Sequence, residues 1–442
     1  MGKILYNCVM AKIFRPYDPD QLLLLPPSLD DWLPEDHLAR FIDDLVNRLD
    51  LSGITSRYDE ERGYPPYHPV MMTKVLLYGY AVGIYSGRRL AKAIETDVAF
   101  RYLTAQNFPG HRTIIRFRRE HRVALGKLFK QVLNACREAG LVKLGTVSID
   151  GTKMKANASK HKAMSHKRML ERKDEYTKAI QDWFDRADRE DDEEDRRLGQ
   201  DQRGDELPEH LRTKQKRLAK IDEALKALER EAREQAEEEG KDPSEAKVPD
   251  KAQKNFTDPD SKILKTGDGF IQGYNAQAAV DCESQVIVAH DVFPDGSDSL
   301  HLVEMVERIE EETGQIPEQS IADAGYYSAD GVRRIEEMGT EAFIATARSK
   351  HEEPPPAPRG RPPTDLTPRQ KMQRKLLTKR GKKIYAKRKT SVEPVFGQVK
   401  QERGFRNFLL RGLGLVAKEW AIICTVHNIV KLWRSEWAPA TK

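Results

Sequence analysis

Apolar residues in the first third of the chain recur every three or four positions, as they do on one face of a helix. The repeat is clearest in DHLARFIDDLVNRLDL, which begins at Asp36. Further helices are predicted by the segments VMMTKVLLYGYAVGI, RRLAKAIE and HRTIIRFRREHRVALGKLFKQVLNACREAGL, the last of them as one long helix. Turn residues such as Pro65-Pro66 and Pro109-Gly110 separate these segments. Residues 1–140 therefore predict an all-α domain.

The last of these helices is basic at its start, where Arg112, Arg116 and Arg118 lie close together. Short helices joined by tight turns and ending in a basic helix are typical of helix-turn-helix DNA-binding domains. An ordinary small helical bundle with a basic face has the same pattern. The sequence leaves both interpretations open.

A short apolar segment, LGTVSID, predicts a strand that ends at Asp150 and opens an α/β region over 141–160. Residues 161–258 then break the pattern, because most of them are charged. Two apolar stripes run through this part, and they are formed by Tyr176, Ile180 and Trp183 and by Leu218, Ile221, Leu225 and Leu228. They predict an antiparallel coiled-coil hairpin with an acidic loop at its tip. Dimerisation, DNA clamping and simple protrusion remain open as its role.

The α/β pattern resumes over 259–350. GYNAQAAVD and SQVIVAHDV predict a strand hairpin, and a helix over 299–313 follows. SIADAGY predicts a strand that ends at Asp323, before a helix over 330–338 and a strand at EAFIATA. Without the insertion these elements form one mixed sheet with helices on its faces. Residues 351–368 read as a proline-rich linker, and 369–442 as a basic segment followed by helices around Glu393 and over 415–433.

Charge and composition narrow the function classes. Between Arg369 and Lys389 eleven residues are Lys or Arg and none is acidic, although the whole chain has a net charge of only +5. Such a local block favours a polyanionic partner, nucleic acid first, and a solvated basic linker is the alternative. The sequence has no apolar run long enough to predict a transmembrane helix. The four cysteines are scattered without a CxxC pair, which argues against a zinc knuckle and predicts a reducing cytoplasm.

Three acidic residues are candidates for a catalytic site. Asp150 and Asp323 end two predicted strands, and Glu393 begins a helix. Three carboxylates brought together repel one another unless cations lie between them, and Mg²⁺ prefers oxygen ligands. A pair of such ions catalyses phosphoryl displacement. Ordinary surface acids are the alternative.

Asp298, in PDGSDSLHL, fits either a supporting acid or a helix cap. The helix cap is favoured, and Ser297 or Ser299 also fits that role.

The segments VSIDGTKMKANASK, TDPDSKILKTGDGFIQGYNAQAAVD, IADAGYYS and YAKRKTSVEPVFGQVKQERGFRNFLLRGL occur in an order that resembles DDE transposases of bacterial insertion sequences. The segment GRRLAKAIETDVAFRYLTAQNFPGHRTIIRFRREH is similar to their helical N-terminal domain. The resemblance covers residues 17–435 and is strongest to the insertion-sequence type numbered eleven-eighty-two. It implies an RNase H-like catalytic core and an enzyme that cuts transposon ends and joins them to new DNA.

The resemblance also assigns residues. It implies that Asp150, Asp323 and Glu393 are catalytic and hold two Mg²⁺ ions, for which Mn²⁺ substitutes. Related transposases carry a Tyr, Arg, Glu, Lys signature around the glutamate, and here Tyr385, Glu393 and Lys400 match it. Arg388 stands one residue farther from the glutamate than the signature has it, whereas Lys389 has the expected spacing. The resemblance therefore implies that Arg388 or Lys389 contacts DNA, together with Lys400 and Tyr385, near the scissile bond.

Three function hypotheses follow. The first is a transposase that acts on double-stranded DNA as a homodimer, without a membrane, near the nucleoid in a bacterial cytoplasm. The second is an RNase H-like nuclease that cuts but does not join DNA. The third is a non-catalytic DNA-binding protein derived from a transposase, against which the three intact acids argue.

Overall fold

The computed structural model describes residues 28–58, 66–198, 209–238, 240–267, 269–347, 360, 363 and 365–437. The predicted helical N-terminal region is confirmed. Its α-helices are α1 (Leu38–Arg48), α2 (Ser52–Thr55), α3 (Pro69–Ala81), α4 (Gly87–Thr96), α5 (Val98–Thr104), α6 (His111–Glu120) and α7 (Arg122–Glu138). The single long helix predicted from His111 is wrong. The chain leaves helical geometry at His121, which has φ −100° and ψ 11° and packs its ring against Phe117 and Tyr58.

A mixed sheet follows, as predicted. Its strands are β1 (Thr146–Lys155), β4 (Lys262–Thr266), β5 (Gly269–Asp281), β6 (Ile287–Phe293), β7 (Gln319–Ala322) and β8 (Glu341–Ile344). The order is β4-β5-β1-β7-β8, with β6 also paired to β5. Strands β1, β7 and β8 are parallel to one another, whereas β5 is antiparallel to β1, β4 and β6. Strand β1 runs five residues beyond Asp150, so this acid lies in mid-strand and the predicted strand end there is wrong.

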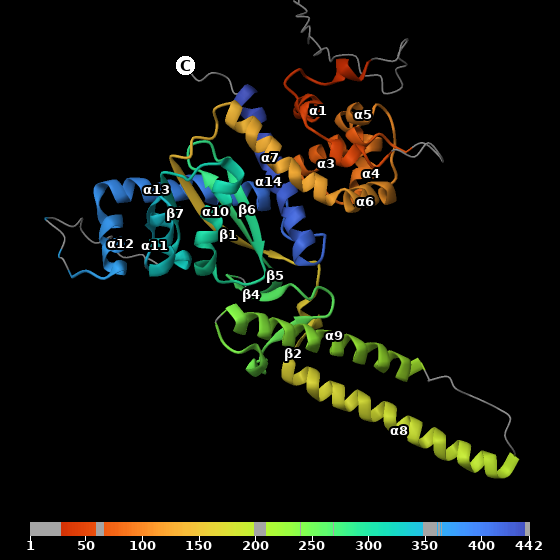
Figure 1. Ribbon diagram of the computed structural model, residues 1–442. Helices are drawn as coiled ribbons and strands as arrows, with labels where there is room; N and C mark the ends of the chain where they lie inside the picture. Colours follow the sequence, from red (N-terminus) through yellow and green to blue (C-terminus); the bar gives the residue numbers. More distant parts are fainter. Residues whose placement is uncertain are drawn as a thin grey trace, which may run out of the picture.

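Helices cover both faces of the sheet (Figure 1). Helix α10 (His301–Thr313) packs against β5 and β6, and α11 (Ala329–Glu337) packs against β8. After the proline-rich segment, most of which lies outside the described residues, the chain forms α12 (Pro368–Leu377), α13 (Lys379–Gly397) and α14 (Leu413–Trp437). Helix α13 lies across β1, β5 and β7, and this packing brings its side chains over the middle of the sheet.

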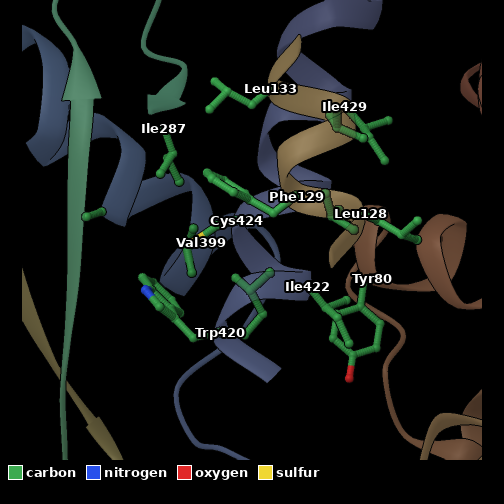
Figure 2. Close-up of a cluster of buried hydrophobic side chains, with 14 of the residues drawn as sticks. Tyr80, Leu128, Phe129, Leu133, Ile287, Val399, Trp420, Ile422, Cys424 and Ile429 are labelled. Atoms are coloured by element: carbon green, nitrogen blue, oxygen red, sulfur yellow. The ribbon is translucent and has the colours of Figure 1, made fainter. Parts of the chain in front are cut away.

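Helix α14 joins the N-terminal helices to the sheet. It packs against α7 on one side and β6 on the other. Figure 2 shows Phe129 of α7, Trp420 and Ile429 of α14 and Ile287 of β6 in one cluster of buried side chains. One continuous apolar core therefore extends from α1 to α14, so the N-terminal helices do not have a separate core. By length and composition α14 could cross a membrane, but 72% of its apolar window is buried inside the protein, as expected of a core helix.

The charged insertion forms two long helices, α8 (His166–Leu198) and α9 (Glu209–Glu238), which contact each other and project from the sheet (Figure 1). Two short strands, β2 (Ala163–Ser165) and β3 (Gln253–Asn255), pair at its base. Helix α8 extends through the acidic segment that was predicted to be a loop. The side chains from Glu190 to Asp195 and that of Trp183 lie outside the described set, and supercoiling of the two helices stays a prediction.

Part of the predicted apolar seam is present. Ile221, Leu225 and Leu228 are buried together with Met169, and Tyr176 packs against them. The cluster also contains Val248, Ala252 and Phe256 from the segment that returns to the sheet, which the sequence did not predict. This part of the insertion thus has a small core of its own, separate from the main one.

We expect an isolated fragment of residues 158–260 to fold as a helical unit, because it contains every member of that small core. A fragment of residues 160–240 lacks Val248, Ala252 and Phe256 and is expected to melt at a lower temperature, since burial of each large apolar side chain contributes about 1.5–3 kcal/mol. Circular dichroism during heating measures the helical content and the melting temperature of each fragment. A random-coil spectrum of the longer fragment would show that the insertion folds only on the rest of the chain.

Candidate active site

The register of the two central parallel strands brings Asp150 and Asp323 together. Ile149 of β1 is paired with Ala322, the last residue of β7, and each aspartate follows one of these residues. Side chains alternate across a strand, so the two carboxylates lie on the same face of the sheet, the one that α13 covers. Asp323 also caps the short helical turn that follows, because its Oδ1 accepts a hydrogen bond of 2.7 Å from the Gly325 N–H.

Glu393 reaches the same face from α13. The next residue is Pro394, which lacks an N–H and therefore leaves the Thr390 carbonyl without its helical partner. Gln285, in the turn between β5 and β6, replaces that partner and donates from Nε2 to the Thr390 oxygen at 2.8 Å. This contact satisfies the carbonyl and joins α13 to the β5–β6 turn near Glu393.

Arg388 connects the acids. Its Nη1 donates to Asp150 Oδ2 at 2.8 Å, and its Nη2 donates to Glu393 Oε1 at 3.0 Å. The side chains of Arg388 and Asp150 are only 19% and 17% exposed, whereas that of Glu393 is 47% exposed. One guanidinium therefore sits between two of the three predicted catalytic carboxylates.

Burial dominates the electrostatics of Asp150. The pKa of this carboxyl is raised to about 7, mainly by burial and to a smaller extent by the nearby Asp323 and Asp298, although Arg388 and the Gly151 N–H oppose the shift. Burial also raises the pKa of Tyr385, although the neighbouring Arg388 opposes this. The pKa of about 7 is reached with Arg388 already beside the carboxyl, so Asp150 is only about half ionised at neutral pH in this structure.

Asp298 is not the helix cap that the sequence favoured. Neither Ser297 nor the residue that precedes α10 makes a capping hydrogen bond from its side chain. Instead, Asp298 Oδ1 accepts hydrogen bonds from Asn275 Nδ2 at 2.7 Å and from Gln277 Nε2 at 2.9 Å. Sequence reasoning missed these two amides. The signal was present, because they alternate in the otherwise apolar strand segment GYNAQAAV.

The donor chemistry fits a divalent cation, and the arrangement is not fully assembled. Asp150, Asp323 and Glu393 offer the hard oxygen ligands that Mg²⁺ prefers. Within the described ranges, however, no three His, Cys, Asp or Glu side chains are placed ready to hold a metal ion. Arg388 bonds both Asp150 and Glu393 here, so two of the three carboxylates are already occupied by its guanidinium.

The predicted DNA contacts lie in different environments. Lys389 is exposed on α13, whereas Arg388 faces the acids. Lys400 lies in a π-helical turn, Gln398–Glu402, and its Nζ donates to the Lys153 carbonyl at 3.0 Å, so it contacts β1 beyond the carboxylates. Burial lowers the pKa of Lys400.

On α6, Arg112 and Arg116 are exposed, as a DNA contact requires. Arg118 is 7% exposed, and its Nη1 donates to the Tyr85 carbonyl at 2.8 Å and to the Tyr80 hydroxyl at 3.3 Å. Arg118 is therefore not available to DNA as predicted, because its guanidinium is buried and donates to groups of the protein. The sequence could not separate it from the two exposed arginines on the same helix.

Residues 27–120 match the family model of a transposase domain, DUF772, and residues 364–433 match that of the transposase DDE domain. Two segments of the chain are therefore similar to transposase domains. The DDE match contains Tyr385, Arg388, Glu393 and Lys400, whereas Asp150 and Asp323 lie outside both matches and are placed by the geometry alone. No curated protein and no solved structure is similar enough to the chain to be matched.

Asp150→Asn is expected to stabilise the fold above neutral pH in the absence of divalent metal. The folded pKa of about 7 exceeds the ordinary value of 3.8, so the folded state keeps a proton that the unfolded state has lost. Stability therefore falls as pH rises between these values, and an Asn avoids the loss. At pH 8 the gain reaches about 4 kcal/mol, at 1.36 kcal/mol per pKa unit.

Urea unfolding in the presence of EDTA measures this difference. The gain should be clearly larger at pH 8 than at pH 5, because most of the titration lies between these pH values. A gain that is equal at both pH values would mean that Asp150 ionises without cost in the folded protein.

Proposed function

We propose that the protein is a DDE transposase of an insertion sequence, of the type numbered eleven-eighty-two, that cleaves DNA at the ends of its element and joins them to target DNA. The observation that carries the proposal is that Asp150 lies beside Asp323 on neighbouring strands and is joined to Glu393 by Arg388, in a chain with two segments similar to transposase domains. The sheet order supports the RNase H-like core that the sequence resemblance implies.

The side chains of this site have different roles in the proposed reaction. Asp150 and Asp323 form a pair of carboxylates on rigid central strands, and Glu393 approaches them on α13. Arg388 neutralises Asp150 and Glu393 while the site is empty of DNA. When a phosphodiester enters, its charge competes for the guanidinium, and Arg388 then holds the phosphate next to the scissile bond. This exchange frees both carboxylates.

Mg²⁺ held by Asp150, Asp323 and Glu393, as two ions for which Mn²⁺ substitutes, would activate the attacking oxygen and stabilise the leaving one. The residues of the chain position the DNA. Lys389 contacts the backbone from the exposed side of α13, and Arg112 and Arg116 of α6 contact an adjacent stretch of duplex. Cleavage of two ends requires two active sites, so a homodimer on DNA is proposed, in a bacterial cytoplasm near the nucleoid.

The proposal is tested with DNA that carries the inverted repeats flanking the gene, radiolabelled at the 5′ end. Wild-type protein and Mg²⁺ are expected to cut the labelled end and to insert it into a supercoiled plasmid. Cleavage without insertion would favour the RNase H-like nuclease instead. Binding without cleavage in Mg²⁺ or Mn²⁺ would favour the non-catalytic DNA-binding protein.

A further inference from the structure

Polar atoms converge on Gly151, the residue after Asp150, from the face of the sheet opposite to α13. A Cβ atom at this glycine would lie 2.7 Å from Asn275 Oδ1 and 2.9 Å from Asp298 Oδ1. Any side chain here would displace these atoms, so the glycine gives them room directly behind the first catalytic aspartate.

Only one of the two carboxylate oxygens of Asp298 accepts hydrogen bonds from the described part of the chain. The amides of Asn275 and Gln277, which are 1% and 0% exposed, both donate to its Oδ1. No hydrogen bond to its Oδ2 is found within the described part of the chain. This oxygen lies 3.2 Å from the position of a Cβ at Gly325, and Asp323 Oδ1 lies 2.9 Å from the same position. The second oxygen of Asp298 and Oδ1 of Asp323 therefore both lie beside Gly325.

Negative charge at this end of the sheet exceeds the positive charge beside it. Asp298 has no ion pair with a cationic side chain among the described residues, and Arg388 is shared by Asp150 and Glu393. Carboxylates so close together repel one another unless a cation lies near them.

A second, independent observation points to a missing ligand. Asn275 Oδ1 is buried without a hydrogen-bond partner and is aimed at Gly151. Unused buried acceptors are rare in folded proteins, because each costs about 1–3 kcal/mol. A water molecule carried by a divalent cation can donate to this acceptor, since Mg²⁺ usually keeps several waters.

We propose that Asp298 is a fourth carboxylate of this site, which holds a hydrated divalent cation next to Asp323 and is itself oriented by Asn275 and Gln277. The inference rests on the proposed function and adds a residue to it. Asp298 is a positioning residue, because its charge acts through the waters of the cation and through Asp323.

Asp298→Asn separates this role from a structural one. An Asn keeps an Oδ1 that accepts from Asn275 and Gln277, and it loses only the negative charge of the carboxylate. With DNA that carries the ends of the element bound, we expect the affinity of the variant for Mn²⁺, measured by electron paramagnetic resonance of the free ion, to fall about tenfold, as for other groups that support metal ligands. The circular dichroism spectrum and end binding should stay unchanged.

The matched control is Asp295→Asn. Asp295 lies in the same loop, but its Oδ1 faces His301 Nε2 at 3.0 Å, and the affinity for Mn²⁺ should stay within about twofold of wild type. Should Asp298→Asn unfold the protein, Asp298→Glu and Asp298→Gln form a second pair of equal length, of which only the Glu variant is expected to retain the affinity.

The outcomes separate the inference from the proposed function. A wild-type protein that binds Mn²⁺, with Asp298→Asn or the Gln variant binding equally well, overturns the role of Asp298 alone. A wild-type protein that neither binds Mn²⁺ nor cleaves DNA overturns the proposed function and this inference with it.

Discussion

Asp150→Asn, Asp323→Asn and Glu393→Gln are each expected to lower the rate of DNA cleavage by about a thousandfold. Each substitution replaces a charged oxygen by a neutral amide of nearly the same shape, so the fold is retained and a hard anionic ligand is lost. Cation-assisted stabilisation of the reacting oxygens contributes several kcal/mol, and about 4 kcal/mol corresponds to three orders of magnitude in rate. The measurement is cleavage of labelled end DNA under single-turnover conditions in Mg²⁺.

The matched control is Asp291→Asn. Asp291 is on β6 of the same sheet, but it is paired with Arg308 at 3.0 Å, so its loss should leave cleavage within about twofold of wild type. End binding by all variants should stay near wild type, since none of the substitutions removes a basic residue. Cleavage at the wild-type rate by any one of the three active-site variants would exclude that residue from the site.

Most of the fold could be predicted because its elements have strong local patterns. The strands at GYNAQAAVD and SQVIVAHDV pair as a hairpin around Cys282, and helices over 299–313 and 330–338 are present with shifted starts. Strand β4 and the pair β2-β3 were missed, because short polar strands have no clear alternation. The break at His121 was missed because it has neither Gly nor Pro, and only tertiary packing of the ring marks it.

The site was predictable in its residue types and not in its contacts. Asp150, Asp323 and Glu393 are distant in sequence, and pairing of parallel strands under α13 brings them together. Spacing alone favoured Lys389 as the signature residue, whereas Arg388 is the one that faces the acids. The position along the helix decides which of the two side chains faces the acids, because successive side chains on a helix point in directions about 100° apart. Asp298 was misread since its partners Asn275 and Gln277 lie on another strand.

The second large effect is expected on the affinity for DNA, from substitutions in the basic segment over 369–389. Arg369, Lys375 and Arg380 already bond groups of the protein, namely the Thr346 carbonyl, Glu336 and Glu341. The lysines of this segment that are exposed and have no ion pair among the described residues are Lys371, Lys379, Lys382, Lys383 and Lys389. These side chains are therefore available to phosphates.

We expect replacement of Lys379, Lys382, Lys383 and Lys389 by Gln to reduce the slope of log K against log salt by about 3.6, which is 0.9 for each lost phosphate contact. Between 50 and 200 mM salt such a change alters the relative affinity about a hundredfold. Fluorescence anisotropy of labelled end DNA at four or more salt concentrations gives both slopes.

A variant with the same loss of charge controls for the net charge of the chain. Lys178 of α8 and Lys216, Lys220 and Lys226 of α9 are exposed on the insertion, away from α13. If DNA lies along α13, replacing these four by Gln leaves the slope nearly unchanged, because counterions are released only where a lysine meets a phosphate. Equal reductions by the two quadruple variants would mean that the duplex also follows the insertion. A wild-type slope for the α13 variant would show that the basic segment is solvated, and the path of the DNA over Glu393 would then have to start from α6.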